Sequence, residues 1–256
     1  LEMATARLGT ALALSTSVPI AKAFGHIDVS RPILVCHIML CIGLISFFMY
    51  TFMDKKLDAS VSKEETKSSE DEFKLKDIVE IIGNKGFWYI AILCVLFYSA
   101  VFPFLKYAAD LMVNKFGVEE SLAGAIPALL PFGNILLTPL FGGIYDRKGK
   151  GASIMILGSL ILIFVHLMFS MPFIHNWVIA IVLILLLGIG FSLVPSAMWP
   201  SVPKIIPEKQ LGTAYALIFW VQNWGLMGVP ALIGWVLDKY CITGQTVREG
   251  LTVNTY

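Results

Sequence analysis

Charged residues are scarce in this sequence. Lysine, arginine, aspartate and glutamate make up 14% of its 256 residues, whereas a soluble domain carries about 25%. Hydrophobic residues make up 57%, which leaves too little polar surface to cover a water-soluble enzyme. A mainly disordered chain is excluded as well, because disordered chains are polar and highly charged. The net charge of +1 and the lack of a basic stripe argue against nucleic-acid binding. The composition therefore predicts a chain that crosses a membrane several times.

Cysteine pairs and catalytic motifs are also missing. The four cysteines, Cys36, Cys41, Cys94 and Cys241, form no CxxC pair, and three of them lie in apolar runs, where a thiol behaves as a small hydrophobic group. The sequence contains no GxSxG or HExxH motif and no pair of intramembrane aspartates. We therefore expect no disulfide framework, no metal, no cofactor and no enzyme. The first apolar run follows Arg7 without a cleavage-site pattern, so we expect no signal peptide.

Long uncharged stretches indicate membrane-spanning helices, each of which needs about 20 apolar residues. The stretch 151–203 is too long for one crossing, and the turn at residues 172–176 divides it in two. Six spans are predicted, within residues 33–53, 87–105, 121–145, 151–171, 177–203 and 211–237. A shorter seventh candidate, residues 8–21, lies between Arg7 and Lys22, whose side chains can reach the two membrane surfaces. Helices are predicted because backbone amides in lipid need partners within the segment.

Seven prolines interrupt these spans. They are Pro103, Pro127, Pro131, Pro139, Pro195, Pro200 and Pro230. In a membrane bundle the neighbouring helices can satisfy the carbonyls that a proline leaves free. Two interpretations stay open: kinks that improve packing, or hinges in helices that move.

One long polar segment separates the first two spans from the rest. Residues 54–77 hold six lysines and eight acids, with Phe73 as the only aromatic, which predicts a solvated linker with a short amphipathic helix near residues 73–82. Most lysines and arginines outside the spans fall on the side of this linker. The positive-inside rule then places the linker and the loop 146–150 in the cytoplasm.

The loop after residues 121–145 has the pattern G-x-x-x-D-R-x-G-K, formed by Gly142, Asp146, Arg147, Gly149 and Lys150. Gly142 allows a close helix contact, Asp146 can pair with Arg147 or with the positive end of a helix, and Gly149 allows a left-handed turn. The pattern resembles the signature loop of the major facilitator superfamily, found there after the second and eighth helices. The resemblance implies a latch that holds the cytoplasmic side closed in the outward-open state. A generic basic turn is the alternative.

If the loop follows helix eight, the chain resembles helices 5–11 of a twelve-helix carrier. The expected fold is an all-α polytopic membrane protein with about seven helices. Residues 1–53 would end the N-terminal six-helix half, 54–82 form the linker, and 83–256 form the C-terminal half without its last helix. The chain then looks like a fragment, and its partners are the lipid bilayer, a small-molecule substrate and the missing N-terminal half. Whether an accessory membrane subunit also binds stays open.

Several blocks resemble one group of that superfamily, the lysosomal dipeptide uniporters. The blocks are residues 97–104, 197–200, 206–215, 222–223 and 6–9. The resemblance implies transport of a small organic solute, here a dipeptide, by alternating access. The departures Lys106 and Trp220 leave the substrate open, so a proton-coupled porter for an organic anion, a sugar or a drug is an alternative. A seven-helix receptor is the alternative from another class. The membrane would be lysosomal in an animal and the plasma (inner) membrane in a bacterium.

Polar residues near the middle of the spans are the first candidates for substrate binding. Tyr98, Asn134, Gln222 and Asn223 lie about 17–20 Å from the start of their spans at 1.5 Å per residue, near the middle of a core of ~30 Å. Tyr215, Phe219, Gln222 and Leu226 share one helical face and can line the same cavity, with Trp199 as a wall. The alternatives are interhelical hydrogen bonds for the polar residues and an interface anchor for Trp199.

Four cationic or titratable residues have two interpretations each. Lys106 either snorkels to the outer edge or contacts an anionic group at the outer mouth. The resemblance implies that Arg7 holds a substrate carboxylate, which suits a guanidinium, but a cytoplasmic anchor fits equally. His37 and His166 either carry a proton or pack against a backbone partner. A peptide ammonium would need a buried carboxylate, yet the only acids in the second-half spans are near span ends.

Overall fold

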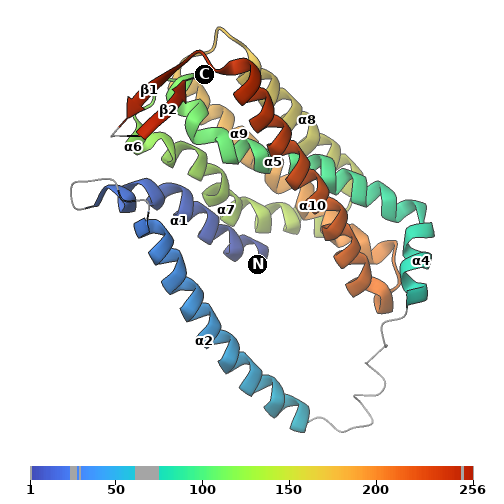
Figure 1. Ribbon diagram of the computed structural model, residues 1–256. Coiled ribbons are helices and arrows are strands. Elements are labelled where there is room, and N and C mark those ends of the chain that lie inside the picture. Colours follow the sequence, from blue (N-terminus) through green and yellow to red (C-terminus); the bar gives the residue numbers. More distant parts are fainter. Residues whose placement is uncertain (1, 24–27, 29, 61–74, 249–250, 256) are drawn as a thin grey trace.

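The computed structural model describes residues 2–23, 28, 30–60, 75–248 and 251–255, with the side chains of 8–23, 28, 30–60, 75–245 and 247. Long helices dominate these residues (Figure 1). They are α1 (Glu2–Lys22), α2 (Ser30–Ser60), α5 (Lys85–Asn114), α7 (Ala125–Lys148), α8 (Gly151–Ser170), α9 (Trp177–Met198) and α10 (Leu211–Val236). Shorter helices are α4 (Leu75–Gly83) and α6 (Glu120–Ala123), the 3₁₀ turns η2 (Trp199–Lys204) and η3 (Glu208–Gln210), and the π-helical turn η4 (Leu237–Cys241). The predicted helical fold is confirmed.

A small hairpin follows the last helix and was not predicted. Strands β1 (Gly244–Arg248) and β2 (Leu251–Thr255) pair antiparallel, with Gly244 opposite Thr255 and Arg248 opposite Leu251. It stands at the end of the helical bundle and does not change the helical architecture (Figure 1).

Six helical segments in the described residues are long and apolar enough to cross a membrane. They cover Ser30–Ser60, Lys85–Asn114, Glu120–Lys148, Gly151–Ser170, Trp177–Lys204 and Glu208–Cys241, so the six predicted spans are confirmed. Helix α1 has 21 residues, or about 31 Å at 1.5 Å per residue. It is not among the six segments, so its own crossing stays a prediction.

The outer surface of the bundle is apolar, as lipid contact requires. On α8, Ile156, Leu160 and Ile163 are exposed, whereas Leu162 and Val165 on the opposite face are buried. A soluble helix would instead carry polar side chains on its outer face. Mean hydropathy is 2.4 over this segment, so the arrangement is that of a membrane-spanning helix.

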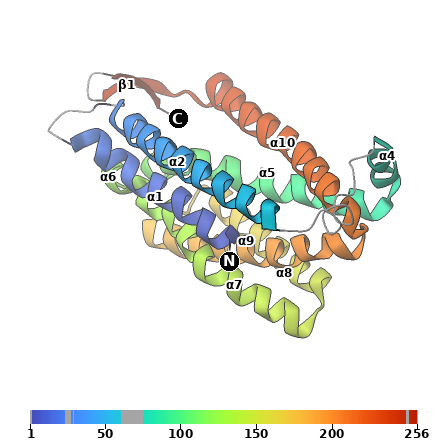
Figure 2. The same cartoon turned by 90° about the horizontal axis from the view of Figure 1, so that it is seen from below.

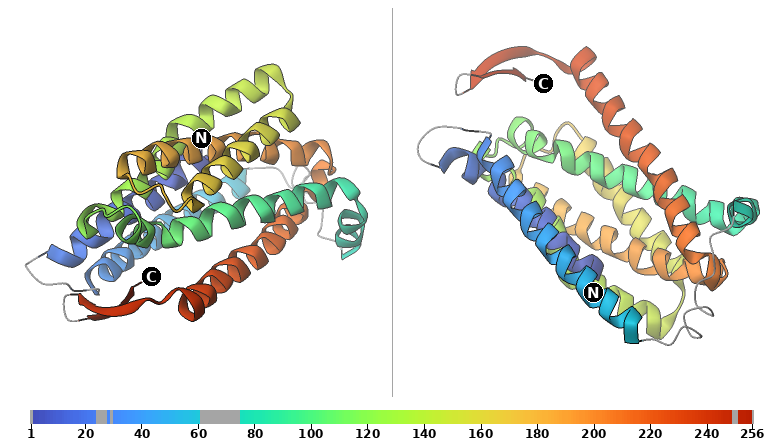
Figure 3. Two further views of the ribbon diagram at one scale, coloured as in Figure 1. Left: turned by 90° about the horizontal axis from the view of Figure 1, so that it is seen from above. Right: turned by 60° about the horizontal axis from the view of Figure 1, so that its bottom comes forward.

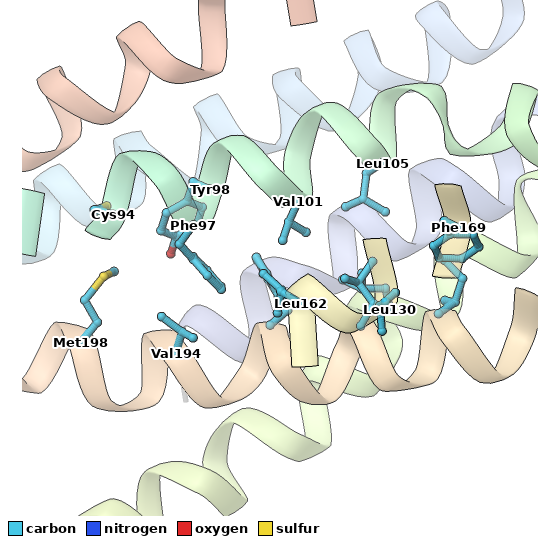
Figure 4. Close-up of a cluster of buried hydrophobic side chains, with 14 of the residues drawn as sticks. Cys94, Phe97, Tyr98, Val101, Leu105, Leu130, Leu162, Phe169, Val194 and Met198 are labelled. Atoms are coloured by element: carbon cyan, nitrogen blue, oxygen red, sulfur yellow. The ribbon is translucent and has the colours of Figure 1, made fainter. Parts of the chain in front are cut away.

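The core lies where α5, α7, α8 and α9 meet. Figure 4 shows Cys94, Phe97 and Val101 of α5 facing Val194 and Met198 of α9. Helices α8 and α9 pack closely along much of their length, and α10 packs on α5. Figure 3 shows α10 on one side of the bundle, with α1 and α2 on the other.

The two leading helices differ in how they pack. Helix α1 runs along α7, and at Gly124 a Cβ atom would come within 2.5 Å of the carbonyl oxygen of Leu14. Helix α2, by contrast, has no residue buried against another described part of the chain, and Figure 2 shows it on the outside of the molecule. Most of its surface is therefore available to lipid or to a further protein segment.

The helix α2 extends past the predicted end of its span at Met53 and stops at Ser60. The residues that follow Met53 include Lys55, Lys56 and Leu57, which are good helix formers, so the helix continues out of the membrane. The predicted amphipathic helix is present as α4. The middle of the predicted linker, residues 61–74 with Phe73, lies outside the described residues.

Candidate functional site

Three predicted site residues meet where α9 ends. The 3₁₀ turn η2 begins at Trp199, with Pro200 as its second residue, and the indole of Trp199 lies between α5 and α10. The indole Nε1 of Trp199 donates to the hydroxyl of Tyr98 at 3.2 Å. The hydroxyl of Tyr215 donates to the carbonyl oxygen of Trp199 at 3.4 Å. Tyr98, Trp199 and Tyr215 thus form one hydrogen-bonded group from three elements.

Aromatic rings surround this group. The ring centroids of Trp199 and Phe219 lie 5.1 Å apart, and those of Trp199 and Tyr215 lie 5.9 Å apart. On the inner side, Tyr98 stacks on Phe102 at 5.6 Å. Tyr98 is buried, Trp199 and Tyr215 are half-buried, and Phe219 is 45% exposed. The cluster is closed toward the core and open toward the surface of α10.

Gln222 lies deeper on the same face of α10. It is 8% exposed, and its Oε1 accepts a hydrogen bond from the Sγ of Cys94 at 3.1 Å. Cys94 and Tyr98 are one helical turn apart on α5, so Gln222 lies beside the aromatic cluster. The thiol therefore does more than fill space: it is a weak donor that occupies the carbonyl end of the amide.

Asn134 is held in a different place, between α7 and α9. The hydroxyl of Ser192 donates to Asn134 Oδ1 at 2.6 Å, and Ser196 donates to the carbonyl oxygen of Ser192 at 2.6 Å. Asn134 is 1% exposed, and its Nδ2 has no hydrogen-bond partner among the described residues. An unsatisfied buried donor costs about 1–3 kcal/mol. This amide belongs to an interhelical contact that is separate from the aromatic cluster.

The other predicted binding residues do not join either group. Asn223 is exposed, and its Nδ2 donates to the carbonyl oxygen of Phe219 one turn earlier at 2.8 Å. Lys106 is exposed beside a cavity of about 440 Å³ between α5 and α10. The backbone of Arg7 is in α1, but its side chain lies outside the described residues.

The two intramembrane histidines differ in their surroundings. The Nδ1 of His166 lies 2.8 Å from the carbonyl oxygen of Leu162, and its Nε2 lies 3.0 Å from that of Ala100. His166 thus links α8 to α5, as expected for packing with a backbone partner. It also lines a cavity of about 470 Å³ between α5, α8 and α10, which includes none of the predicted binding residues. His37 is exposed on α2.

The G-x-x-x-D-R-x-G-K pattern forms the end of α7 and the turn to α8. Gly149 has a φ of 63°, as the predicted turn requires, and donates from its amide to the carbonyl oxygen of Tyr145 at 2.8 Å; the next residue, Lys150, is left-handed with a φ of 54°. Asp146 and Arg147 are exposed, and neither forms an ion pair within the described part of the chain. A Cβ atom on Gly142 would meet no atom within 4 Å, so the close helix contact expected there is not made by any described residue.

Tyr145, inside the pattern, fixes this turn. It is 5% exposed and accepts a hydrogen bond from the Nζ of Lys204 at 2.6 Å. The same Nζ lies 4.8 Å from the centroid of the Tyr145 ring, and a Cβ on Gly151 would come within 2.8 Å of that ring. Tyr145 therefore ties the exposed Asp146 and Arg147 to η2, the element that begins with Trp199.

Sequence reasoning missed four residues of these sites: Cys94, Tyr145, Ser192 and Ser196. The two serines are four residues apart in an apolar helix, which puts them on one face, and that spacing was a usable signal. Cys94 and Tyr145 gave no comparable signal, because each is one apolar residue among many. No group of three metal-ligating side chains occurs among the residues that the structure describes.

Most of the chain is similar in sequence to known proteins. Residues 2–230 match the family model of the Major Facilitator Superfamily. A protein named lysosomal dipeptide transporter MFSD1 from Gallus gallus is 29% identical over 214 residues, which are 84% of this chain and 47% of that protein. Its counterpart from Danio rerio is 29% identical over 93% of this chain and 52% of that protein. The Homo sapiens counterpart is 28% identical over 93% of this chain and 51% of that protein. The chain spans about half the length of the curated relatives it matches.

Proposed function

The chain belongs to the major facilitator superfamily. From this premise we propose that the full-length protein moves a small organic solute across a membrane by alternating access, with short peptides as the substrate class. The observation that carries transport is the family match over residues 2–230. The peptide class is supported by relatives that are named dipeptide transporters. The same match favours a carrier over a seven-helix receptor.

The proposed substrate contact is the aromatic cluster around Trp199. Carriers of this kind bind solute near the membrane midplane, between their two halves. Trp199, Tyr215 and Phe219 offer a partly open aromatic wall with two tyrosine hydroxyls nearby, and Gln222 adds an amide at its inner edge. Such a surface suits the amide plane and apolar side chains of a peptide. Arg7 on α1 is the proposed partner for the peptide carboxylate.

The two parts of the chain are proposed to belong to different halves of the carrier. The packing of α1 along α7 supports a contact between halves, because the predicted linker, residues 54–82, separates the two helices in sequence. The exposed surface of α2 is proposed to contact the remainder of the full-length protein and lipid. The bias of lysine and arginine supports a cytoplasmic position for the linker side. A lysosomal membrane is the proposed location in an animal.

The test is uptake of a labelled dipeptide into liposomes that contain the full-length protein, with empty liposomes as the background. Trp199→Phe keeps a ring but removes the bond to Tyr98, and it should lower uptake severalfold at unchanged protein content. Trp220→Phe is the matched control, because Trp220 is 61% exposed and its ring contacts Trp224 rather than this cluster. Uptake equal to that of empty liposomes would refute the peptide class. Equal effects of the two substitutions would refute the site.

A further inference from the structure

Helix α4 has an apolar stripe that is not covered by the described part of the chain. Leu75, Val79 and Ile82 recur at spacings of four and three, so they lie on one helical face. Their exposed fractions are 75%, 71% and 44%. By contrast, Ile81 is 1% exposed and packs into the core of the bundle. Three large aliphatic side chains in a row are costly to leave in water.

Polar contacts fix which way this stripe faces. Gln210, which is 5% exposed at the start of α10, donates from its Nε2 to Asp77 Oδ1 at 3.0 Å and to Glu80 Oε2 at 2.8 Å. Both carboxylates lie on the other side of α4 from Val79. On the outer side of Glu80, Lys76 forms an ion pair at 3.5 Å. The bond to α10 therefore holds the helix with its apolar stripe turned away from Gln210.

The stripe continues onto the exposed outer face of α5, a candidate membrane-spanning helix. The indole Nε1 of Trp88 donates to the carbonyl oxygen of Ile82 at 2.8 Å, which joins the end of α4 to the outer face of α5. That face goes on with Tyr89, Ile92 and Leu96, which are 75%, 51% and 65% exposed on a membrane-spanning helix. Tryptophan and tyrosine at this level are typical of the membrane–water interface. Figures 1 and 3 show α4 lying crosswise to α5 at the end of the bundle.

We propose that α4 lies in the interface of the bilayer on the linker side, with Leu75, Val79 and Ile82 among the lipid chains. An amphipathic helix of this kind places its apolar face about 5–10 Å below the headgroups. Lys76 and Lys85 balance Asp77 and Glu80 in charge, so zwitterionic lipid is a sufficient partner. Through Gln210 and Asn84, which caps α5 with its side chain, the anchored helix holds the ends of α10 and α5 at the membrane surface.

The test is spin-label accessibility in the full-length protein, reconstituted in phosphatidylcholine vesicles, with accessible cysteines outside these 256 residues replaced by serine. Cys36, Cys41 and Cys241 are replaced by serine, while Cys94 stays because it is fully buried and will not be labelled. Nitroxides are then attached one at a time at Leu75→Cys, Val79→Cys and Lys76→Cys. Oxygen, which is enriched in lipid, and a nickel chelate, which stays in water, are used as relaxing agents.

Labels at positions 75 and 79 should be more accessible to oxygen and less accessible to nickel than the label at position 76, with a depth of about 5–10 Å. High nickel accessibility at all three positions would show that the stripe faces water. Low accessibility to both agents at 75 and 79 would show that protein covers it. Either result overturns the proposal.

Discussion

At the scale of single residues, substitutions at Gln222 and Cys94 distinguish a packing role of Gln222 from a role in substrate binding. Cys94→Ala removes the same interhelical hydrogen bond that Gln222→Ala removes, and such bonds in membranes are worth about 0.6 kcal/mol. If the amide contacts substrate, Gln222→Ala alone should lower dipeptide uptake, roughly tenfold for a contact of about 1.4 kcal/mol. Transport by the full-length protein in liposomes, normalised to protein content, measures this. Equal losses of uptake in the two variants would mean that Gln222 serves packing and not substrate binding.

Lys115 has a titration that should affect stability. Its Nζ donates to the carbonyl oxygens of Phe169 and Met171, at 2.5 and 2.8 Å, where α8 ends. Loss of hydration lowers the pKa of Lys115 below its ordinary value of 10.5. In the window just below pH 10.5 the unfolded state thus binds more protons than the folded state, and the free energy of unfolding should rise with pH.

Lys115→Arg keeps a cation at this helix end but does not titrate in that window. The thermal stability of the wild-type chain relative to this variant, measured in detergent as a function of pH, should therefore increase as pH 10.5 is approached. A relative stability that falls over the same window would contradict the lowered pKa.

The sequence predicted polar residues near the middle of the spans but did not predict their hydrogen-bond partners. Depth follows from counting along a helix; of the four polar residues placed near the middle by that count, Tyr98, Gln222 and Asn134 are buried, whereas Asn223 is exposed. Partners depend on how helices rotate about their axes and on where they cross. An apolar span without a marked polar face does not encode that rotation, so the bond between Ser192 and Asn134 was not foreseen.

At the scale of elements, two glycines set the distance between α8 and α9. A Cβ on Gly158 would lie 2.7 Å from Val194 Cγ2 and 3.0 Å from the carbonyl oxygen of Gly190. Gly158→Ala should therefore destabilise the chain by about 1–3 kcal/mol, the usual penalty for an overpacked contact. The control is Gly228→Ala in α10, where a Cβ meets no atom within 4 Å and helix propensity improves by about 1 kcal/mol.

Unfolding of both variants in mixed detergent micelles is the measurement. Equal stability of Gly158→Ala and Gly228→Ala would mean that α8 and α9 can move apart without lowering the free energy of unfolding. The close packing was not predicted, although Gly158 and Gly190 are visible in the sequence. Neither lies in a small-xxx-small pair that would have marked it as a contact.

Helix lengths show where sequence reasoning reaches its limit. The uncharged window 87–105 located the membrane part of α5, but the helix runs on through Lys106 and Asp110 to Asn114. Charge ends the apolar layer without ending the helix, because lysine and other long side chains keep good helix propensity in water. Windows of hydrophobicity therefore predict membrane crossings better than they predict helix ends.

At the scale of the whole molecule, the accessible surface area is larger than that of a compact soluble monomer of the same mass. The accessible area is 16442 Å², whereas a compact soluble monomer of 28.2 kDa would expose about 11,000 Å². Helix α2 contributes to this area, because none of its residues is buried. Together with relatives about twice as long, this area fits a chain whose surfaces meet lipid and further helices. The resemblance to helices 5–11 of a twelve-helix carrier predicted such an arrangement.

The latch proposed for the loop 146–150 gives a comparison between this chain and the full-length protein. Asp146 and Arg147 are exposed here, while Tyr145 is buried and bonded to Lys204. Asp146→Asn should leave the thermal stability of the 256-residue chain unchanged, because its partners lie elsewhere. Tyr145→Phe should lower that stability by about 1.5–3 kcal/mol, since the lost bond has a charged donor.

If Asp146 holds the other half of the full-length protein as proposed, both substitutions should lower dipeptide uptake, because Tyr145 positions the turn that carries Asp146. Uptake in liposomes and melting of the shorter chain in detergent are measured on the same set of variants. Lys148→Gln is the control, an exposed residue of the same turn outside the G-x-x-x-D-R-x-G-K matches. If Asp146→Asn destabilised the short chain as much as Tyr145→Phe, the carboxylate would act within this half, and the latch between halves would be refuted.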